Sequence, residues 1–166
     1  MFEDAMAIVH KYGNPTLFIT MTCNPNWPDI QEAIRYENSK GQTIQQEAQY
    51  RPDIIARAFH IRVKKLISRL MDDQIFGKAL AYVAVIEHQK RGLPHLHLIL
   101  TLTRDDRRRT LDNVDDIISA ELPDPITEKK LYEIISKNMV HGPCGKDNPN
   151  CYCMVDGKCR FGFPKK

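Results

Sequence analysis

Two histidines near the middle of the chain have the type and spacing of metal ligands. His95 and His97 alternate within the run Pro94-His95-Leu96-His97-Leu98. If this run is a strand, both imidazoles project from one face and the leucines from the other. Neighbouring imidazoles can chelate a divalent cation, so the pair predicts a metal site. The alternative is a pair of hydrogen-bonded histidines that only support the sheet.

A carboxylate joins this pair if the flanking segments form a tight hairpin. Two β-type runs, Ala79–His88 and Pro94–Leu102, are separated by a connection of hairpin length. A turn centred on Arg91 places Glu87 opposite His95. A register shift of one residue would put the neighbouring histidine in its place. The predicted set of two imidazoles and one carboxylate leaves positions open for water or a phosphate oxygen, as a catalytic cation requires. It suits Mn²⁺, Co²⁺ or Zn²⁺ better than Mg²⁺.

A second group of candidate ligands lies in the last part of the chain. Its members share a stretch rich in glycine and proline and poor in apolar residues: His141, Cys144, Cys151, Cys153 and Cys159. Such a stretch cannot order itself by burial alone. Zn²⁺ takes four nitrogen or sulfur donors, so the group predicts a structural zinc site. The alternatives are reduced thiols in a flexible tail or a disulfide, which the lack of a signal-like N-terminus disfavours.

Charge and aromatic content point weakly to nucleic acid. The chain has 24 Lys and Arg against 21 Asp and Glu, a formal charge of +3 and a pI near 8.6. The segment 104–109 carries four arginines that suit phosphate contacts: Arg104, Arg107, Arg108 and Arg109. Trp27 offers a ring for base stacking, or alternatively caps the core. The longest apolar run, Ala79–Ile86, is far shorter than the roughly 18 residues of a membrane span, so we expect no membrane partner.

These candidate residues require a sheet with helices packed against it. The periodicity predicts helices at 3–12, 28–36, 52–71, 112–120 and 127–139, strands at 16–22, 79–88 and 94–102, and loops at 37–50 and 104–109. The central hairpin excludes a crossover helix, so we expect an α+β fold with an antiparallel sheet flanked by helices. We place a core domain at 1–139 and a Cys/His-rich zinc-binding segment at 140–166.

Several stretches resemble a known family. They are Phe18-Ile19-Thr20-Met21-Thr22-Cys23-Asn24-Pro25, the segment from Glu87 to His97, Val140-His141-Gly142-Pro143-Cys144-Gly145 and Phe163-Pro164-Lys165. Together they resemble the Helitron transposase Rep domain, also labelled the Helitron helicase-like domain. The resemblance implies an HUH endonuclease on a ferredoxin-like or RRM-like antiparallel sheet. Such enzymes nick and transfer single-stranded DNA in rolling-circle transposition.

The resemblance also implies roles for particular residues. Glu87, His95 and His97 match the family's ligands for the catalytic cation. The structural zinc set that it implies is His141, Cys144, Cys153 and Cys159, with Cys151 as the alternate. The partners implied are single-stranded DNA and the C-terminal Rep and helicase regions of the full-length family proteins. The location implied is nuclear in a eukaryote and intracellular otherwise.

The family's nucleophile is a tyrosine in a motif that follows the Phe-Pro-Lys segment. We therefore expect that motif to lie outside these 166 residues. Tyr132 is a candidate by residue type, but its helical surroundings favour a packing role. The expected protein is a metal- and DNA-binding portion of the nuclease that does not nick alone. A non-catalytic nucleic-acid-binding module and an inactive transposon remnant are the alternatives.

Overall fold

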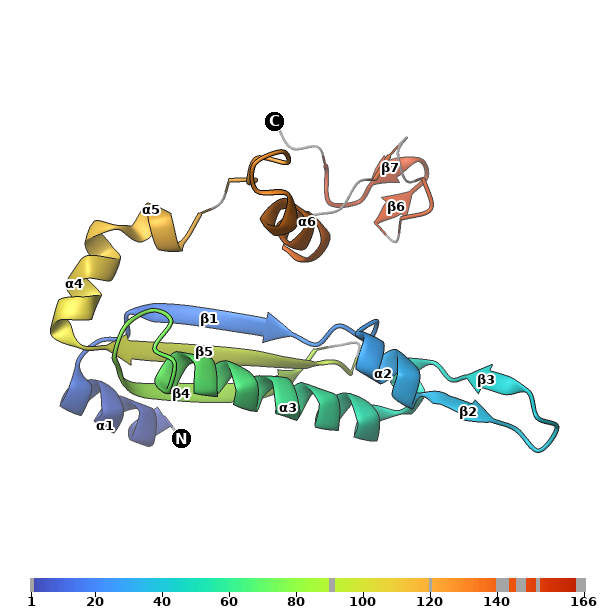
Figure 1. Cartoon of the computed structure of the whole chain (residues 1–166), viewed down its shortest axis with the longest axis horizontal. Helices are drawn as coiled ribbons and strands as arrows, with labels where there is room; N and C mark the ends of the chain where they lie inside the picture. Colours follow the sequence, from blue (N-terminus) through green and yellow to red (C-terminus); the bar gives the residue numbers. More distant parts are fainter. Residues whose placement is uncertain are drawn as a thin grey trace. The chain divides into compact units, whose positions relative to one another are not determined.

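The chain folds as two compact units, residues 1–117 and residues 118–166. The computed structural model describes residues 2–89, 92–119, 121–139, 144–145, 149–151 and 153–163. Figure 1 shows the elements of both units. The contacts divide the chain after Ile117, so the helix predicted at 127–139 belongs to the second unit.

The first unit contains most of the secondary structure. In chain order its elements are α1 (Phe2–Tyr12), β1 (Leu17–Thr22), α2 (Pro28–Ala33), β2 (Arg35–Glu37), β3 (Thr43–Gln45), a short 3₁₀ helix η1 (Ala48–Tyr50), α3 (Pro52–Met71), β4 (Ala79–His88), β5 (Pro94–Leu102), α4 (Arg104–Asp112) and α5 (Val114–Ile117). The predicted α+β class is confirmed. The structure also confirms the bounds predicted for α3, β4 and β5.

The three long strands form one antiparallel sheet in the order β1-β5-β4. In the β4–β5 pair Glu87 lies opposite His95, which confirms the register predicted from the short connection. On the other edge of β5, Thr22 of β1 lies opposite the same histidine. The central position of β5 therefore surrounds His95 with a residue from each neighbouring strand.

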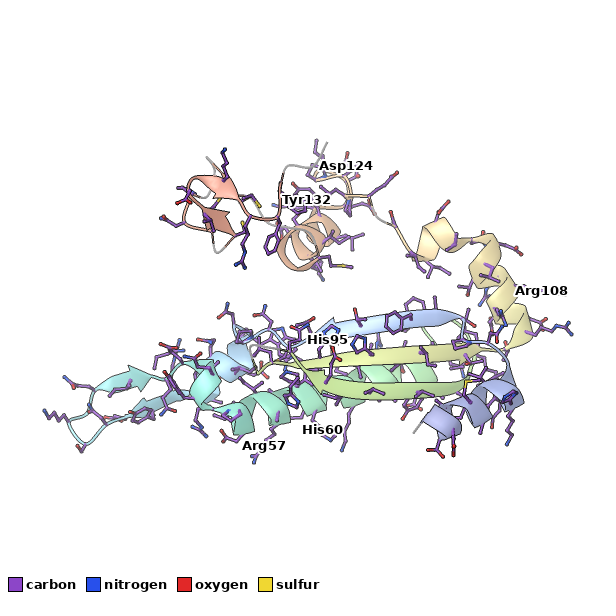
Figure 2. All side chains as sticks on the ribbon, turned by 180° about the vertical axis from the view of Figure 1, so that it is seen from behind. Arg57, His60, His95, Arg108, Asp124 and Tyr132 are labelled. Carbon is purple, nitrogen blue, oxygen red and sulfur yellow. The ribbon has the colours of Figure 1, made fainter. Side chains whose placement is uncertain are left out.

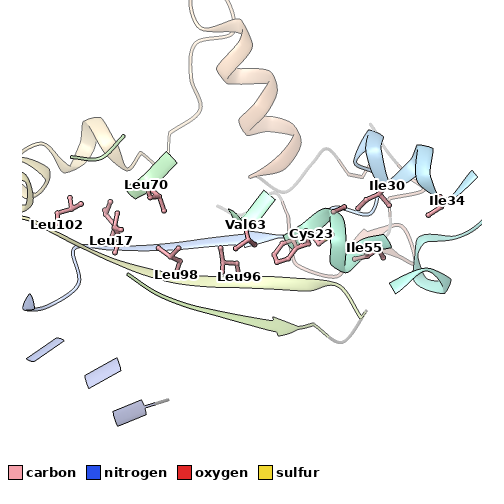
Figure 3. Close-up of a cluster of buried hydrophobic side chains, with 13 residues drawn as sticks. Leu17, Cys23, Ile30, Ile34, Ile55, Val63, Leu70, Leu96, Leu98 and Leu102 are labelled. Atoms are coloured by element: carbon pink, nitrogen blue, oxygen red, sulfur yellow. The ribbon is translucent and has the colours of Figure 1, made fainter. Parts of the chain in front are cut away.

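Alternation along β5 decides which face of the sheet is covered. Leu96, Leu98 and Leu100 have no exposed surface, whereas His95 and His97, which alternate with them, are partly exposed. Helix α3 contributes Phe59 and Val63 to the same buried cluster (Figure 3). Each fully buried leucine stabilises the fold by about 1.5–3 kcal/mol. The leucine face therefore anchors β5 and turns the histidines to the opposite face.

The segment predicted as a polar loop at 37–50 is instead a hairpin, β2–β3, followed by η1. Its turn is built by Asn38, whose side-chain oxygen accepts hydrogen bonds from the backbone N–H groups of Lys40 and Gln42, both at 2.9 Å. Gly41 supplies the positive φ of 73° that the turn needs. Local turn chemistry outweighs the low β propensity of these residues.

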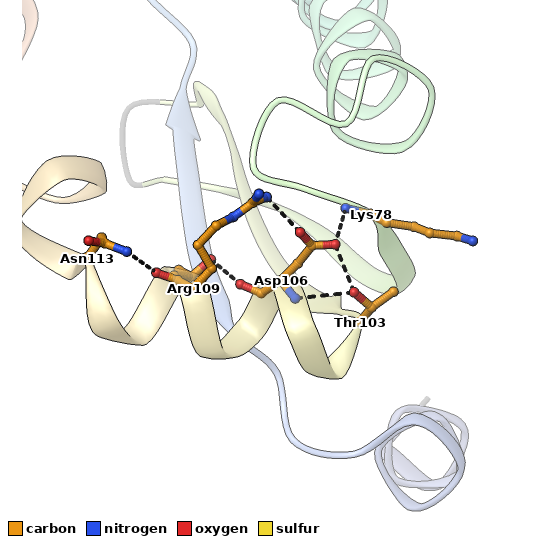
Figure 4. Close-up of polar contacts among 6 residues, drawn as sticks. Lys78, Thr103, Asp106, Arg109 and Asn113 are labelled. Atoms are coloured by element: carbon orange, nitrogen blue, oxygen red, sulfur yellow. Dashed lines mark hydrogen bonds and ion pairs between the residues drawn. The ribbon is translucent and has the colours of Figure 1, made fainter.

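The segment predicted as a basic loop at 104–109 is the start of helix α4, and the helix predicted at 112–120 is reduced to the short α5. Thr103 caps α4 by accepting a hydrogen bond from the backbone N–H of Asp106. The Asp106 carboxylate in turn accepts hydrogen bonds from the Thr103 hydroxyl and the backbone N–H of Lys78 (Figure 4). This reciprocal cap, a Thr-x-x-Asp sequence, explains why the arginines are helical.

The second unit contains α6 (Lys129–Asn138) and a small hairpin of β6 (Met154–Val155) and β7 (Lys158–Cys159). Asp156 and Gly157 connect the two strands with positive φ values of 50° and 74°. Two successive positive φ values are typical of the tight turn that joins twisted strands. The hairpin holds Cys159 at its end, close in sequence to Cys153 at its start.

Candidate metal centre

The three predicted ligands converge at one end of the histidine face of the sheet. One donor atom from each of Glu87, His95 and His97 can be chosen so that all three lie within 4.8 Å of one another. The Oε1 atom of Glu87 lies 3.0 Å from Nε2 of His97. The side chains of His97 and Glu87 are 35% and 57% exposed, so the cluster is open to solvent.

Strand β1 adds two contacts that sequence reasoning missed. Oγ1 of Thr22 lies 2.8 Å from Nδ1 of His95, so the hydroxyl can accept the Nδ1 proton. That tautomer leaves the Nε2 lone pair of His95 for a cation, as the outer partners of metal-bound histidines commonly do. Phe18 stacks on the His97 ring with centroids 5.7 Å apart. Both contacts depend on the β1–β5 pairing, and the alternation of Phe18, Thr20 and Thr22 was the available sequence signal.

The electrostatics of the cluster favour an ionised carboxylate. The hydrogen bond from His97 lowers the pKa of Glu87 below its usual value. Desolvation opposes this lowering of the Glu87 pKa, and electrostatic attraction to His97 and His95 adds to it. An ionised carboxylate beside two imidazoles carries the charge that a divalent cation requires.

The donor set fits a divalent cation. Nitrogen and oxygen ligands lie about 2.0–2.2 Å from Zn²⁺, so two donors to one ion are at most about 4 Å apart. The donor atoms of the cluster lie within 4.8 Å of one another, which is close to that separation. A cation placed there would replace the proton shared by Glu87 and His97. Three protein ligands on an exposed face leave coordination positions for an oxygen of a substrate.

A second cluster lies in the second unit and consists of cysteines. Sulfur atoms of Cys144, Cys153 and Cys159 lie within 4.8 Å of one another. The sulfur of Cys151 lies 3.4 Å from that of Cys153, which is fully buried. His141, the remaining predicted ligand, lies outside the described residues. The described residues therefore bring four thiols together.

The cysteine cluster favours a thiolate at one position. Burial alone would raise the pKa of the Cys159 thiol, but backbone N–H groups of Phe163 and Phe161 donate to its sulfur. These hydrogen bonds, with those from neighbouring thiols, lower the pKa of Cys159 to about 6. Burial raises the pKa of Cys153 to about 12, and hydrogen bonds with its neighbours add to the rise. One thiolate among protonated thiols is a suitable starting point for binding a thiophilic cation.

The residues predicted to contact DNA lie in two different places. The four arginines belong to α4, at the opposite end of β5 from His95; Figure 2 shows Arg108 and His95 well apart along the first unit. Arg109 pairs with Asp106 at 2.7 Å. Trp27 lies beside the core, with Arg62 4.0 Å above its ring and Phe59 stacked on it. This packing supports its core-capping alternative, and its base-stacking role stays a prediction.

Tyr132 lies on α6 in the second unit and is half-buried. Its backbone N–H donates to the carbonyl of Glu128 at 2.9 Å, in the first turn of the helix. This arrangement agrees with the packing role favoured by its sequence surroundings. A catalytic role for Tyr132 stays untested.

Comparison with known protein families shows which family the chain is related to. The profile of the family described as "Helitron helicase-like domain at N-terminus" matches residues 1–100. The chain belongs to this family. The match to the Helitron helicase-like domain includes Glu87, His95 and His97 and does not extend to the cysteine cluster. No curated protein matches the chain. Among the described residues, every helix is too short or too polar to cross a membrane.

Proposed function

We propose that the first unit is the metal- and DNA-binding part of an HUH-type endonuclease acting on single-stranded DNA. The observation that carries this proposal is the convergence of Glu87, His95 and His97 on an exposed sheet face. Membership of the Helitron helicase-like family supports a role in transposition. The HUH-type relationship of the antiparallel sheet is part of the same proposal.

Each residue of the cluster would have a different role in binding the cation. His95 and His97 supply nitrogen ligands, Glu87 supplies an anionic oxygen, and Thr22 holds His95 in the tautomer that leaves Nε2 free. The bound cation, Mn²⁺ more readily than Mg²⁺, would act as a Lewis acid on a phosphate oxygen. The stacking of Phe18 on His97 restricts the rotation of the second imidazole.

The arginines of α4 extend the proposed DNA surface. Between His95 and Leu102, β5 rises about 3.4 Å per residue, so about 24 Å of strand separate the cluster from the start of α4. A single strand that touches both would span several nucleotides. Contacts of this kind release counterions, so binding should weaken as salt concentration rises.

A direct test uses labelled single-stranded DNA with Mn²⁺ or with a chelator. We expect Mn²⁺-dependent binding by the wild type and its loss in His95→Ala. Binding that is indifferent to metal and to His95→Ala would contradict the proposal. Among the described residues we assign no nucleophile, so we expect no covalent adduct at the 5′ end of a cleaved strand. An adduct would show that a nucleophile is present in this chain.

We further propose that the cysteine cluster holds structural zinc. Cys144, Cys153 and Cys159 supply three donors, and the fourth is either Cys151 or the predicted His141. Single variants distinguish them: zinc content should fall in Cys151→Ser or in His141→Ala, but not equally in both. Protein purified without chelator that contains much less than one equivalent of zinc would contradict the site.

A further inference from the structure

A cavity of about 550 Å³ lies beyond the end of the sheet that carries the candidate metal centre. This volume is within the range of about 300–1,000 Å³ that small-molecule sites occupy. Five carboxamide side chains line it: Asn26, Gln31, Gln45, Gln46 and Gln49. Its other lining residues are the carboxylate Glu47 and the apolar Pro25, Ala48 and Leu93. No lysine or arginine lines it among the described residues, so its chemistry suits a neutral ligand with a polar edge.

Hydrogen bonds fix the orientation of two of these carboxamides. The guanidinium of Arg35 donates to Oε1 of Gln45 at 3.0 Å. Gln45 then donates from Nε2 to Oε1 of Gln31, and Gln31 donates from Nε2 to the carbonyl of Pro25 at 2.8 Å. A chain that starts from a pure donor leaves each amide a single satisfactory orientation. The relay ties the β2–β3 hairpin to the turn that follows β1 and forms one wall of the cavity.

Other polar atoms of the lining are not used within the described part of the protein. Within the described residues the Asn26 carboxamide makes no hydrogen bond. The Asn26 group that bonds to Asn24 is the backbone N–H. Gln46 accepts from Arg51 through Oε1, which leaves its Nε2 atom available. Glu47 accepts from Gln49 through Oε2, which leaves Oε1 to accept another donor. The cavity thus offers a paired donor and acceptor from one amide and an additional anionic acceptor.

A nucleobase matches this combination. Its flat faces suit the apolar residues, and its edge presents fixed donors and acceptors. An Asn or Gln carboxamide pairs in a bidentate manner with adenine, and Asp or Glu accepts from an exocyclic amine. Thymine has no exocyclic amine, and its one edge donor, N3–H, lies between two carbonyl oxygens that the free oxygen of Glu47 would repel.

Two strands connect the cavity to the metal centre. Leu93 precedes His95 by two residues, and Pro25 follows Thr22 by three. Two residues of extended chain span about 7 Å, so a base in the cavity and a phosphate at the cluster can belong to one short stretch of DNA. We propose that this cavity binds a nucleobase with an exocyclic amine, adenine above all, next to the phosphate held at the metal centre. The proposal rests on the DNA-binding function proposed above.

Two oligonucleotides test it in the presence of Mn²⁺. One is an all-thymidine single strand, and the other carries a single central deoxyadenosine. We expect the wild type to bind the second at least about fivefold more tightly, the lower end of the discrimination that such base contacts supply. Asn26→Ala and Glu47→Gln should bring the ratio close to unity. Asn14→Ala, an exposed asparagine at the other end of β1, serves as the control and should keep the wild-type ratio.

A titration with free deoxyadenosine and thymidine separates this proposal from the one on which it rests. Deoxyadenosine should shift the NMR signals of the Asn26 side-chain amide more strongly than thymidine does. If the wild type binds neither oligonucleotide, the proposed function fails, and the nucleoside titration alone decides the cavity's role. If the wild type binds both strands equally, or if the variants keep its preference, the cavity proposal is overturned while metal-dependent DNA binding stands.

Discussion

The two ligand clusters differ in what holds them in place. Glu87 and His97 are partly exposed and project from paired strands whose opposite face is a buried leucine layer. Cys153 is fully buried, but it lies in a segment whose strands are two residues each. The first cluster is positioned by a scaffold that exists without a cation. The second has little scaffold, so an ion would supply much of its order.

The two proposed sites would use a metal ion in different ways. A site meant for chemistry keeps open coordination positions and a rigid support, whereas a structural site encloses its ion. Removing the cation should therefore leave the first unit folded and disorder the second.

The largest effect should follow removal of the cysteine cluster. Cys153→Ser replaces the buried central thiol, so zinc should fall from about one equivalent to nearly none, because a structural site needs its full set of donors. The NMR signals of the second unit should collapse toward random-coil positions while those of β4 and β5 persist. The matched variant Ser136→Ala, in α6, should keep its zinc. Retention of zinc by Cys153→Ser would remove the contrast between the clusters.

The scaffold of the first cluster should respond to a core deletion. Leu98 is fully buried and directly follows His97 on β5, so Leu98→Ala should cost about 2–5 kcal/mol of unfolding free energy. Denaturant unfolding of the first unit measures this loss, and zinc content should not change. Leu80→Ala, on an exposed position of β4, should cost no more than about 0.5 kcal/mol. Similar losses in the two variants would show that the leucine layer is not the support.

Positioning of His95 by Thr22 gives a smaller, specific effect. Thr22→Val keeps the shape but removes the oxygen 2.8 Å from Nδ1, so Mn²⁺ affinity should fall about 10- to 100-fold. Calorimetric titration measures the affinity, and Thr22→Ser should restore most of it. Thr20→Val changes the adjacent exposed threonine of β1, opposite His97, and should leave affinity unchanged. Equal losses in both valine variants would indicate a general disturbance of β1.

The smallest expected effect is on stability at acid pH and involves the N-terminal cap of α4. This cap is part of the scaffold of the first unit. Hydrogen bonds from Thr103 and from the backbone of Lys78 lower the pKa of Asp106 below its usual 3.8. In that range the unfolded chain binds the proton more readily, so this stabilisation is present above 3.8 and is lost as pH falls through the lowered pKa. Thermal melting should show a smaller acid-induced decrease in Asp106→Asn than in the wild type. The neighbouring exposed Asp105→Asn should behave as the wild type, and identical behaviour of all three proteins would contradict the prediction.

Local patterns were sufficient to predict that Glu87, His95 and His97 come together. The short connection between two β-type runs set the register of Glu87 and His95, and the alternation of leucines set the face of the histidines. The contacts of Thr22 and Phe18 were not predictable in the same way. They depend on which strand pairs with the far edge of β5. The alternation of Phe18, Thr20 and Thr22 indicates which residues share a face of β1, but it does not identify a partner strand more than 70 residues away.

Other differences between the predicted and the observed elements come from local hydrogen bonds and backbone angles, which residue propensities do not describe. The β2–β3 hairpin depends on the side chain of Asn38 and on the positive φ of Gly41 rather than on β-branched residues. The high charge of residues 104–109 favoured a loop over helix α4, although the Thr103 and Asp106 cap was present in the sequence. The amide-lined cavity required both the hairpin and the turn after β1, so no single stretch of sequence indicated it.

The central claim is that Glu87, His95 and His97 bind one divalent cation, and Mn²⁺-induced broadening of the histidine imidazole NMR signals tests it most directly. The account predicts that substoichiometric Mn²⁺ broadens His95 and His97 first, that His60 on α3 is affected only later, and that Glu87→Gln greatly weakens the effect. Broadening that begins at His60, or that is the same in Glu87→Gln, would contradict it.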